Sequence, residues 1–546
     1  MSKVAAYLQQ HIQGQVSTQP LALDAMSRDA SVLSIVPEMV VYPRVTNDIR
    51  KVARFAWQLA EKGHVFSITA RGGGSDQTGA AIGKGAIIAL SAHMSHILEF
   101  DAKQKLIRLQ PGVTVATLSE SLKLYGMSIP ALPIAVPYST VGGAVSNNAS
   151  SPLSGKYGAM NDWVYQLEVV LASGDVLQTE RLSKRDLNRK KGLQTFEGEI
   201  YRSLDNLIED NKELIKSQLP GVDDIRNNVG YTALSQVKRR DGSFDLTPLF
   251  VGAQGTLGVV SEMILKTEFV SASNAVAVIG FDSSEAARDA IDNILEMKPS
   301  VANYYSGELM QLAAEAGRTY EIAKTLGKTP GAVILVAFDE FGDAARQRKL
   351  KKLRKQFEGM EGVAVLATDG PEAEELMAIG DVSTFNTLSD AKGVTAPALF
   401  DGAYIPPERF EEFFKAVTLL AEKHRVALPL HGWLLESIYT TRPQLQLKKV
   451  GDKQKIFKLL DEYANLVEHH GGHLIAESGE GRLKTRFAYK DFDPELVKLF
   501  DQVRAIFDPH GILNPQVKQT IDVRSLVPRL GSGDQLQTPG EYLPIR

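Results

Sequence analysis

Residues 70–81 read ARGGGSDQTGAA and place three consecutive glycines directly after the apolar run VFSIT. A loop of this kind has little side-chain volume and many backbone N–H groups, and glycine lets a ligand approach the backbone closely. Successive N–H groups in a tight turn form a positive concavity that suits phosphate. The stretch lacks the Gly-Lys-Ser/Thr ending of a Walker loop and matches the fingerprint G-x-G-x-x-G poorly. It therefore predicts a phosphate cradle of another kind.

Three further stretches rich in glycine and small polar residues follow along the chain. They are VPYSTVGGAVSNNAS at 136–150, GAQGTLGVV at 252–260 and DPHGILNP at 508–515. A single loop of this type is often only a tight turn. Four of them in a fixed order indicate that separated segments converge on one elongated ligand.

The composition is that of a globular protein with room for more than one core, since the chain has 546 residues, 44% of them hydrophobic and 23% charged. A net charge of −4 gives no basic field and argues against nucleic acid. No apolar run approaches the roughly 18 residues of a membrane span. The N-terminal stretch lacks a signal-peptide core, so we expect a cytoplasmic protein.

The chain contains no cysteine. This excludes disulfides, zinc–thiolate sites and cysteine-ligated iron–sulfur clusters within it. Any electrons that the protein handles must therefore enter and leave through a bound cofactor.

Strand and helix patterns alternate along the chain, and their rhythm changes near residue 270. In the second half the apolar runs AVAVIGF, AVILVAF and GAYI each precede an amphipathic helix. Such units predict an α+β sheet with helices on one face. We expect a helical segment at 1–35, one domain at 36–270, a second at 271–517 and a surface tail at 518–546.

Several motifs in this order resemble the FAD-binding proteins of the vanillyl-alcohol oxidase and p-cresol methylhydroxylase (PCMH) superfamily. They are PEMVVYPRVTNDIRKV, ARGGGSDQTGAA, LQPGVTVATL, TVGGAVSNNAS, GKYGAMNDWVYQLEVVLASGDV, LFVGAQGTLGVVSE and IFDPHGILNP. The likeness covers roughly residues 30–517 and is strongest to the group of D-lactate dehydrogenase and glycolate oxidase subunits. It implies an α+β fold, with a PCMH-type FAD-binding domain of two subdomains and a ferredoxin-like α+β cap that binds the substrate.

The resemblance also implies which residues hold FAD. For the pyrophosphate they are Arg71, Gly72, Gly73, Gly74, Ser75, Gln77, Thr78 and Gly79; for the ribityl chain and flavin Pro137, Ser139, Thr140, Gly142, Gly143, Asn147 and Asn148; for the adenosine end Gly255, Thr256, Gly258 and Val259; and Asn514 returns to the flavin ring. Relatives with covalent flavin often carry a histidine in the first glycine loop. This loop has none, so we expect non-covalent FAD.

The second domain, which the resemblance implies binds the substrate, departs from the family pattern. Where G-E-H-G is usual, this chain keeps Glu477 but has Ser478 in place of the histidine, and the segment H-x-G-D-G-N-x-H is reduced to one histidine, His431. One histidine and one glutamate are too few to predict a closed divalent-metal site. His473 is the candidate to replace the lost base, with Tyr439 and Glu436 as weaker ones. The arginine and lysine that grip the substrate carboxylate in the family are missing from the expected places.

Three functions stay open at this point. The first is oxidation of a small hydroxylated substrate, with D-lactate, glycolate or another 2-hydroxy acid as the family default. The second is an FAD-linked oxidase of a sugar or aldonolactone, and the third is a flavoprotein subunit without turnover. Quinone, oxygen or a redox protein would accept the electrons.

The basic run RQRKLKKLRK at 346–355 predicts a solvated helix face. The alternative is docking on an acidic electron-acceptor protein or on an anionic membrane, which would place the protein peripherally on its inner face. The sequence leaves the oligomeric state open.

Overall fold

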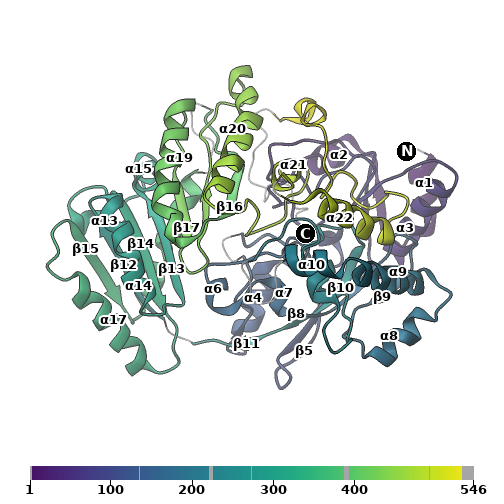
Figure 1. Ribbon diagram of the computed structural model, residues 1–546, viewed down its shortest axis with the longest axis horizontal. Helices are drawn as coiled ribbons and strands as arrows, with labels where there is room; N and C mark the ends of the chain where they lie inside the picture. Colours follow the sequence, from purple (N-terminus) through teal and green to yellow (C-terminus); the bar gives the residue numbers. More distant parts are fainter. Residues whose placement is uncertain are drawn as a thin grey trace.

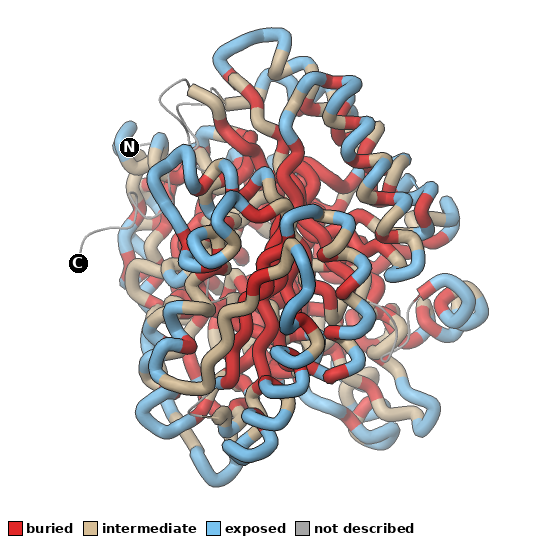
Figure 2. Tube along the Cα trace, turned by 90° about the vertical axis from the view of Figure 1, so that its left-hand side faces the viewer, coloured by how far each residue is buried: buried red, intermediate tan, exposed pale blue. Residues whose placement is uncertain are grey.

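The computed structural model describes residues 3–133, 136–219, 226–271, 274–386, 393–490 and 492–531. Figure 1 shows two regions side by side. One contains the N-terminal half of the chain and its last helices, and the other contains the sheet of the second half. Buried residues run through the middle of the molecule, with exposed residues at its periphery (Figure 2).

The first half is built on two main sheets. The first has the order β1 (Gln15–Ser17), β2 (Met39–Tyr42), β4 (Ala86–Ala89), β3 (Ile68–Arg71), and the second has the order β5 (Ile97–Asp101), β6 (Leu106–Leu109), β10 (Val259–Lys266), β8 (Val164–Val170), β9 (Val176–Gln178). Strands β2, β4 and β3 are parallel, whereas the second sheet is antiparallel. A small pair, β7 (Met127–Ser128) and β11 (Glu268–Phe269), lies beside them. The N-terminal segment predicted as helical thus also supplies a strand, β1.

The helices of this half cover the sheets and carry the loops. They are α1 (Lys3–His11), α2 (Pro20–Met26), α3 (Thr46–Glu61), α4 (Val115–Lys123), α5 (Val141–Ser146), α6 (Ser154–Tyr157), α7 (Met160–Trp163), α8 (Lys184–Lys191), α9 (Phe196–Asp210), α10 (Lys212–Gln218), α11 (Leu234–Val237) and α12 (Thr247–Phe250). The predicted glycine loops occupy the turns between these elements. The first follows β3, the second contains α5, and the third leads into β10.

A seven-stranded antiparallel sheet forms the second half. Its order is β15 (Val363–Thr368), β12 (Ala275–Phe281), β14 (Ala332–Phe338), β13 (Val301–Ser306), β17 (Leu430–Trp433), β18 (Ile438–Thr441), β16 (Phe400–Tyr404). The first four strands follow the order 4-1-3-2 with helical crossovers, which is the ferredoxin-like arrangement. Its helices are α13 (Ser284–Asp289), α14 (Ile291–Leu295), α15 (Gly307–Glu315), α16 (Glu321–Leu326), α17 (Asp343–Phe357), α18 (Ala373–Met377), α19 (Phe410–His424) and α20 (Val450–His469).

Helices cover both faces of this sheet, so the expectation of a one-sided sheet is wrong. Ala277 and Ile279 of β12 face a core with Leu353 of α17, while Val276 and Val278 face a second core with Leu309 of α15. Every residue of β12 and β14 is buried. A strand buried on both sides has apolar residues at every position rather than at alternate ones, and AVAVIGF has that pattern.

The chain returns to its first half after the second sheet. Helix α22 (Pro494–Phe507) follows the short α21 (Thr485–Ala488) and packs against α9. Ile68 of β3 donates its N–H to the carbonyl of Ile512 at 2.8 Å and accepts the N–H of Asn514 at 2.8 Å. The C-terminal motif thus forms an extra bridge at the edge of the first sheet.

The predicted surface tail is wrong at Lys518 and Leu526, which are both buried. The side chains of Lys518 and Glu480 are fully inaccessible, and Lys518 Nζ lies 2.7 Å from Glu480 Oε2. The same ammonium donates to the carbonyls of Asn228 and Gly230 at 3.0 and 2.9 Å. Residues 532–546 of the predicted tail lie outside the described residues.

The basic run lies on α17, where Leu350 and Leu353 are buried, and Arg346 is buried as well, so the predicted solvated face is wrong at Arg346. No helix in the described part of the chain is both long and apolar enough to cross a lipid bilayer.

Replacing Lys518 by Met should lower the free energy of unfolding by about 3–5 kcal/mol, because it leaves the buried carboxylate of Glu480 unpaired. Urea unfolding followed by circular dichroism measures the change. Lys498→Met is the control, since its pair with Glu495 is 66% and 65% exposed and should contribute little to stability. Equal losses in the two variants would contradict a structural role for the buried pair.

Candidate functional site

The first glycine loop presents free backbone donors. Within the described residues, no hydrogen bond uses the N–H groups of residues 73–77. Most backbone donors in a folded protein find a partner, so five consecutive free ones indicate a place for an external acceptor. Phosphate oxygens suit such a row of N–H groups.

Gly73 lets the first and second glycine loops approach each other. A Cβ atom at this position would lie 2.6 Å from the carbonyl oxygen of Tyr138, which real Cβ atoms do not tolerate. The hydroxyl of Ser139, beside it, is buried and has no partner in the described part of the chain. The junction of the two loops thus combines a close backbone approach with an uncommitted polar group.

Amide side chains tie the three glycine loops to the second half of the chain. Gln254 donates to Asn147 Oδ1 at 2.9 Å and to Thr78 Oγ1 at 3.3 Å, and its Oε1 accepts the N–H of Gly481 at 3.0 Å. Asn514 donates to the carbonyls of Ala80 and Gln254, both at 2.8 Å. We call Thr78, Asn147, Gln254 and Asn514 the loop network.

The other predicted cofactor residues fall into two groups. In the first, the side chain is already committed to the fold: Thr140 caps α5 by accepting the N–H of Gly143, Asn148 bonds Asn228, and Thr256 bonds Tyr231 and Ala253. In the second, the residue lies in a loop, helix or strand of the cradle and its side chain makes no hydrogen bond within the described chain: Gly72, Gly74, Ser75, Gln77, Gly79, Pro137, Gly142, Gly255, Gly258 and Val259. The structure brings both groups into the same three loops.

Charged side chains lie in and around the first loop. Asp76 accepts the N–H groups of Thr78 and Ala80 at 2.9 and 2.8 Å, which shapes the turn. Burial and the neighbouring Asp76 raise the pKa of Asp29 to about 7, and Arg71 opposes this shift. Burial lowers the pKa of Arg482 to about 9 although Asp29 and Asp76 oppose it. The guanidinium of Arg71 lies close to Gly74, and that of Arg482 donates to the carbonyl of Gly79 in the same loop.

These observations fit a ligand with a diphosphate. Free donors, an unpartnered hydroxyl and two nearby cations meet where three glycine loops converge, and a side chain on Gly73 would block the approach. The chemistry of this donor set agrees with the cofactor that the sequence pattern implies.

A second feature, the charged cluster, consists of Asp401, Arg442, Glu477 and Lys484. Arg442 holds Asp401 through two hydrogen bonds of 2.9 and 3.0 Å, and Lys484 donates to the carbonyl of Asp401 at 3.1 Å. Antiparallel pairing of β16 with β18 places Asp401 beside Arg442, since Phe400 pairs with Thr441. The register then shifts between Phe400 and Ala403, and a bulge of this kind re-aims side chains at functional sites.

Gly402 in this bulge makes room for Glu477. It has φ +74°, and a Cβ atom there would lie 2.4 Å from the Cβ atom of Glu477. Burial is the largest cause that raises the pKa of Glu477 to about 7, and Asp401 adds to it, while Arg442, Lys484 and Arg226 oppose it. Glu477 is thus a carboxyl group that exchanges its proton near neutral pH.

The charged cluster adjoins the glycine loops. Burial raises the pKa of Tyr138, and the charge of Arg442 opposes this rise. Burial lowers the pKa of Lys484, and the charge of Asp76 opposes this fall. Arg482 and Leu483, just before Lys484, donate their N–H groups to the carbonyl of Thr78 at 3.0 and 3.1 Å. A ligand in the cradle and a small molecule at the cluster would therefore be neighbours.

The structure separates the two predicted histidines. His431 lies on β17 near Arg442 and Asp401, and burial lowers its pKa to about 4. His473 stacks on Tyr404 with ring centroids 5.2 Å apart, and burial followed by the charge of Arg226 lowers its pKa to about 4 as well. Both ring nitrogens of His473 are buried without a partner in the described chain.

Among the described residues, no three His, Asp or Glu side chains are grouped so as to hold a metal ion. The carbonyl of Ser478 accepts a long 3.4 Å bond from Asn228. Tyr439 is buried and stacks on Phe410, which leaves it in the core.

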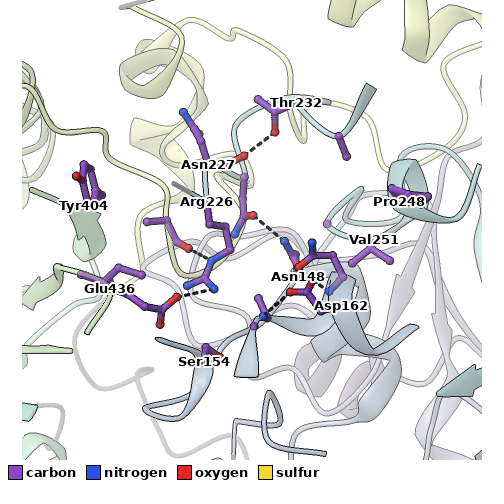
Figure 3. A pocket seen from close by; sticks show the side chains of 18 of the residues that line it. Asn148, Ser154, Asp162, Arg226, Asn227, Thr232, Pro248, Val251, Tyr404 and Glu436 are labelled. Atoms are coloured by element: carbon purple, nitrogen blue, oxygen red, sulfur yellow. Dashed lines mark hydrogen bonds and ion pairs between the residues drawn. The ribbon is translucent and has the colours of Figure 1, made fainter. Parts of the chain in front are cut away.

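Beside the cluster lies a cavity of about 730 Å³, which we call the polar pocket. Its wall comes from both halves of the chain, and Figure 3 shows Arg226 between Glu436 and the side that carries Asn148 and Asp162. Arg226 bonds Glu436 Oε1 at 2.9 Å and the carbonyl of Ala476 at 2.6 Å. Ala476 directly precedes Glu477, so the pocket and the charged cluster share a wall.

Sequence reasoning missed most of the charged residues of the site. Asp76 and Gln254 lie inside quoted motifs, but nothing in the motif distinguishes them from turn residues. Arg442, Lys484 and Asp401 stand outside the motifs and meet only through the pairing of β16 and β18. Arg442 and Lys484 are thus two cations that the motifs did not point to.

Two family profiles match the chain. One is described as "FAD binding domain" and matches residues 37–180, and the other as "FAD linked oxidases, C-terminal domain" and matches residues 270–517. A D-2-hydroxyglutarate dehydrogenase from Pantoea ananatis is 27% identical over 90% of this chain, which spans 49% of that relative's length. A D-lactate dehydrogenase from Archaeoglobus fulgidus is 23% identical, covering 87% of this chain and 90% of the relative.

The fold has a counterpart among solved structures. p-Cresol methylhydroxylase with bound substrate superposes with a TM-score of 0.69 and 12% sequence identity, covering 96% of this chain and 97% of that one. The shared fold, the two profiles and the converging glycine loops agree, and the chain belongs to the FAD-linked oxidases of the vanillyl-alcohol oxidase and p-cresol methylhydroxylase superfamily.

Proposed function

We propose that the protein is an FAD-dependent oxidoreductase that converts a 2-hydroxy acid to the corresponding 2-oxo acid. The observation that supports this most is the charged cluster, where two cations stand beside a carboxyl group with a pKa of about 7. Relatives named D-2-hydroxyglutarate dehydrogenase and D-lactate dehydrogenase act on acids of this class. A free sugar or a lactone has no carboxylate to offer the two cations.

Arg442 and Lys484 would bind the substrate carboxylate. Arg442 presents a planar fork that suits a carboxylate, and Asp401 holds this fork in place by two hydrogen bonds. Lys484 is fixed by the carbonyl of Asp401. Together they would orient the carbon that bears the hydroxyl group.

Glu477 would accept the hydroxyl proton in its ionised form. A general base works best with a pKa near the working pH, and burial gives Glu477 that value. FAD bound in the cradle would supply the acceptor for the hydride that leaves the same carbon. His473, which sequence reasoning favoured as the base, stacks on Tyr404 in the wall of the polar pocket and is the rival candidate.

FAD is bound non-covalently in this proposal, because residues 70–81 contain no histidine, cysteine or tyrosine. Its electrons would pass to a quinone, oxygen or a redox protein, since the chain has no cysteine for an iron–sulfur cluster.

Gly73→Ala should reduce the FAD content of the purified protein several-fold, because the new methyl group would press on the carbonyl of Tyr138 and reshape the cradle. The ratio of flavin to protein absorbance measures the FAD content of each variant. Acid precipitation of the wild type should release all of its flavin, because the flavin is not covalently bound. Gly451→Ala is the matched control, as nothing lies within 4 Å of the added atom. A full FAD content in Gly73→Ala would contradict the proposal that this loop binds FAD.

Glu477→Gln should slow anaerobic flavin reduction by 2-hydroxy acids by about 10²–10⁴-fold and remove its pH dependence. In the wild type the base is ionised above its pKa, so the reduction rate should fall as pH drops through about 7. Stopped-flow absorbance follows the flavin. If His473→Ala abolishes the pH dependence and Glu477→Gln keeps it, His473 is the base instead.

Arg442→Lys should raise the KM for the acid by about 10- to 100-fold with a smaller effect on kcat, because lysine cannot replace the bidentate fork. FAD content should stay unchanged. Arg409→Lys, in an exposed pair with Glu412, serves as the control. An unchanged KM in Arg442→Lys would remove this residue from substrate binding.

A further inference from the structure

The polar pocket contains three buried polar atoms without a partner in the described part of the chain. They are Arg226 Nη2, Glu436 Oε2 and Asn161 Oδ1. All three residues line the cavity. Buried polar atoms in native proteins are almost always hydrogen-bonded, so this group indicates a bound molecule that supplies one acceptor and two donors.

Hydroxyl groups match this requirement better than a second carboxylate. A hydroxyl donates one hydrogen bond and accepts others, so neighbouring hydroxyls can satisfy Arg226 together with Glu436 and Asn161. A carboxylate only accepts and would face the oxygens of Glu436 and Asn161. The positive charge of Arg226 is already held by Glu436 at 2.9 Å, which leaves the pocket without a free cation.

The pocket also lies where the far end of a substrate would extend. Its wall contains Ala476 and Tyr404, whereas the charged cluster uses Glu477, which follows Ala476, and Asp401, which lies on the same strand as Tyr404. A cavity of about 730 Å³ exceeds the needs of glycolate or lactate and falls in the range of about 300–1,000 Å³ that is usual for larger ligands.

We infer that the substrate is a polyhydroxylated 2-hydroxy acid of about four to six carbons, an aldonic acid, whose hydroxylated chain occupies the polar pocket. The inference rests on the proposed function, because Arg442 and Lys484 hold the acid end. Arg226, Glu436 and Asn161 then determine specificity. They favour hydroxyl groups over a bare methyl group and over a second carboxylate.

The test compares anaerobic flavin reduction by glycolate, D-lactate, D-gluconate and D-2-hydroxyglutarate in the wild-type holoenzyme. We expect the highest kcat/KM with D-gluconate, by about tenfold for each hydrogen bond that the shorter acids cannot make. An equal or higher kcat/KM with D-lactate or with D-2-hydroxyglutarate overturns the inference and leaves the proposed function standing. If none of the four acids reduces the flavin, the proposed function itself fails.

The variant Glu436→Gln tests the inference more directly than the comparison of substrates. It removes the charge that neutralises Arg226, so the preference for D-gluconate over D-2-hydroxyglutarate should fall by about tenfold or more. Glu422→Gln makes the same charge change on the exposed face of α19 and should leave the preference unchanged. An unaltered preference in Glu436→Gln overturns the inference.

A binding measurement separates recognition from turnover. Calorimetric titration of the slow Glu477→Gln holoenzyme with D-gluconate should give a dissociation constant about tenfold lower than with D-lactate. Adding Glu436→Gln should remove that difference. Equal affinities of the single variant Glu477→Gln for D-gluconate and D-lactate would overturn the inference.

Discussion

The carbonyl of Thr78 joins the two halves of the site by hydrogen bonds. It accepts the N–H groups of Arg482 and Leu483, so the glycine loop of the first half and the segment that carries Glu477 and Lys484 share one hydrogen-bonded junction. Gln254 reinforces the same junction from the third loop. Any shift of the second half relative to the first would break these bonds, which are buried and have no water to replace them. The distance between the cradle and the charged cluster is therefore built into the fold.

Much of the first half could be predicted from the sequence, because its signals are local. Three glycines after an apolar run indicate a loop after a strand whatever the rest of the chain does, and β3 and its loop lie where ARGGGSDQTGAA placed them. The charged cluster gave no such signal. Asp401 and Arg442 are 41 residues apart and Asp401 and Lys484 are 83 apart, and only strand pairing and a bulge bring them together. The burial that raises the pKa of Glu477 is likewise a property of the tertiary structure.

The second sheet shows another limit of local patterns. Runs such as AVAVIGF indicate a buried strand, but they do not say how many layers bury it. Because every position of β12 is apolar, helices were needed on both faces, and α15 and α16 supply the face that we had expected to be open. The packed strand β13 of this sheet pairs with β17, the strand that carries His431. A rigid support of this kind is what a site with several converging charges requires.

The return of the chain to its first half has a consequence for how the protein is made. Asn514 bonds the carbonyl of Ala80 across a separation of 434 residues, and Arg482 bonds that of Gly79 across 403. A ribosome synthesises the first glycine loop about 20 to 90 seconds before these partners, at roughly 5–20 residues per second. During that interval the nascent first half exposes an unfinished cradle, so capture of the cofactor belongs to the end of synthesis rather than its beginning.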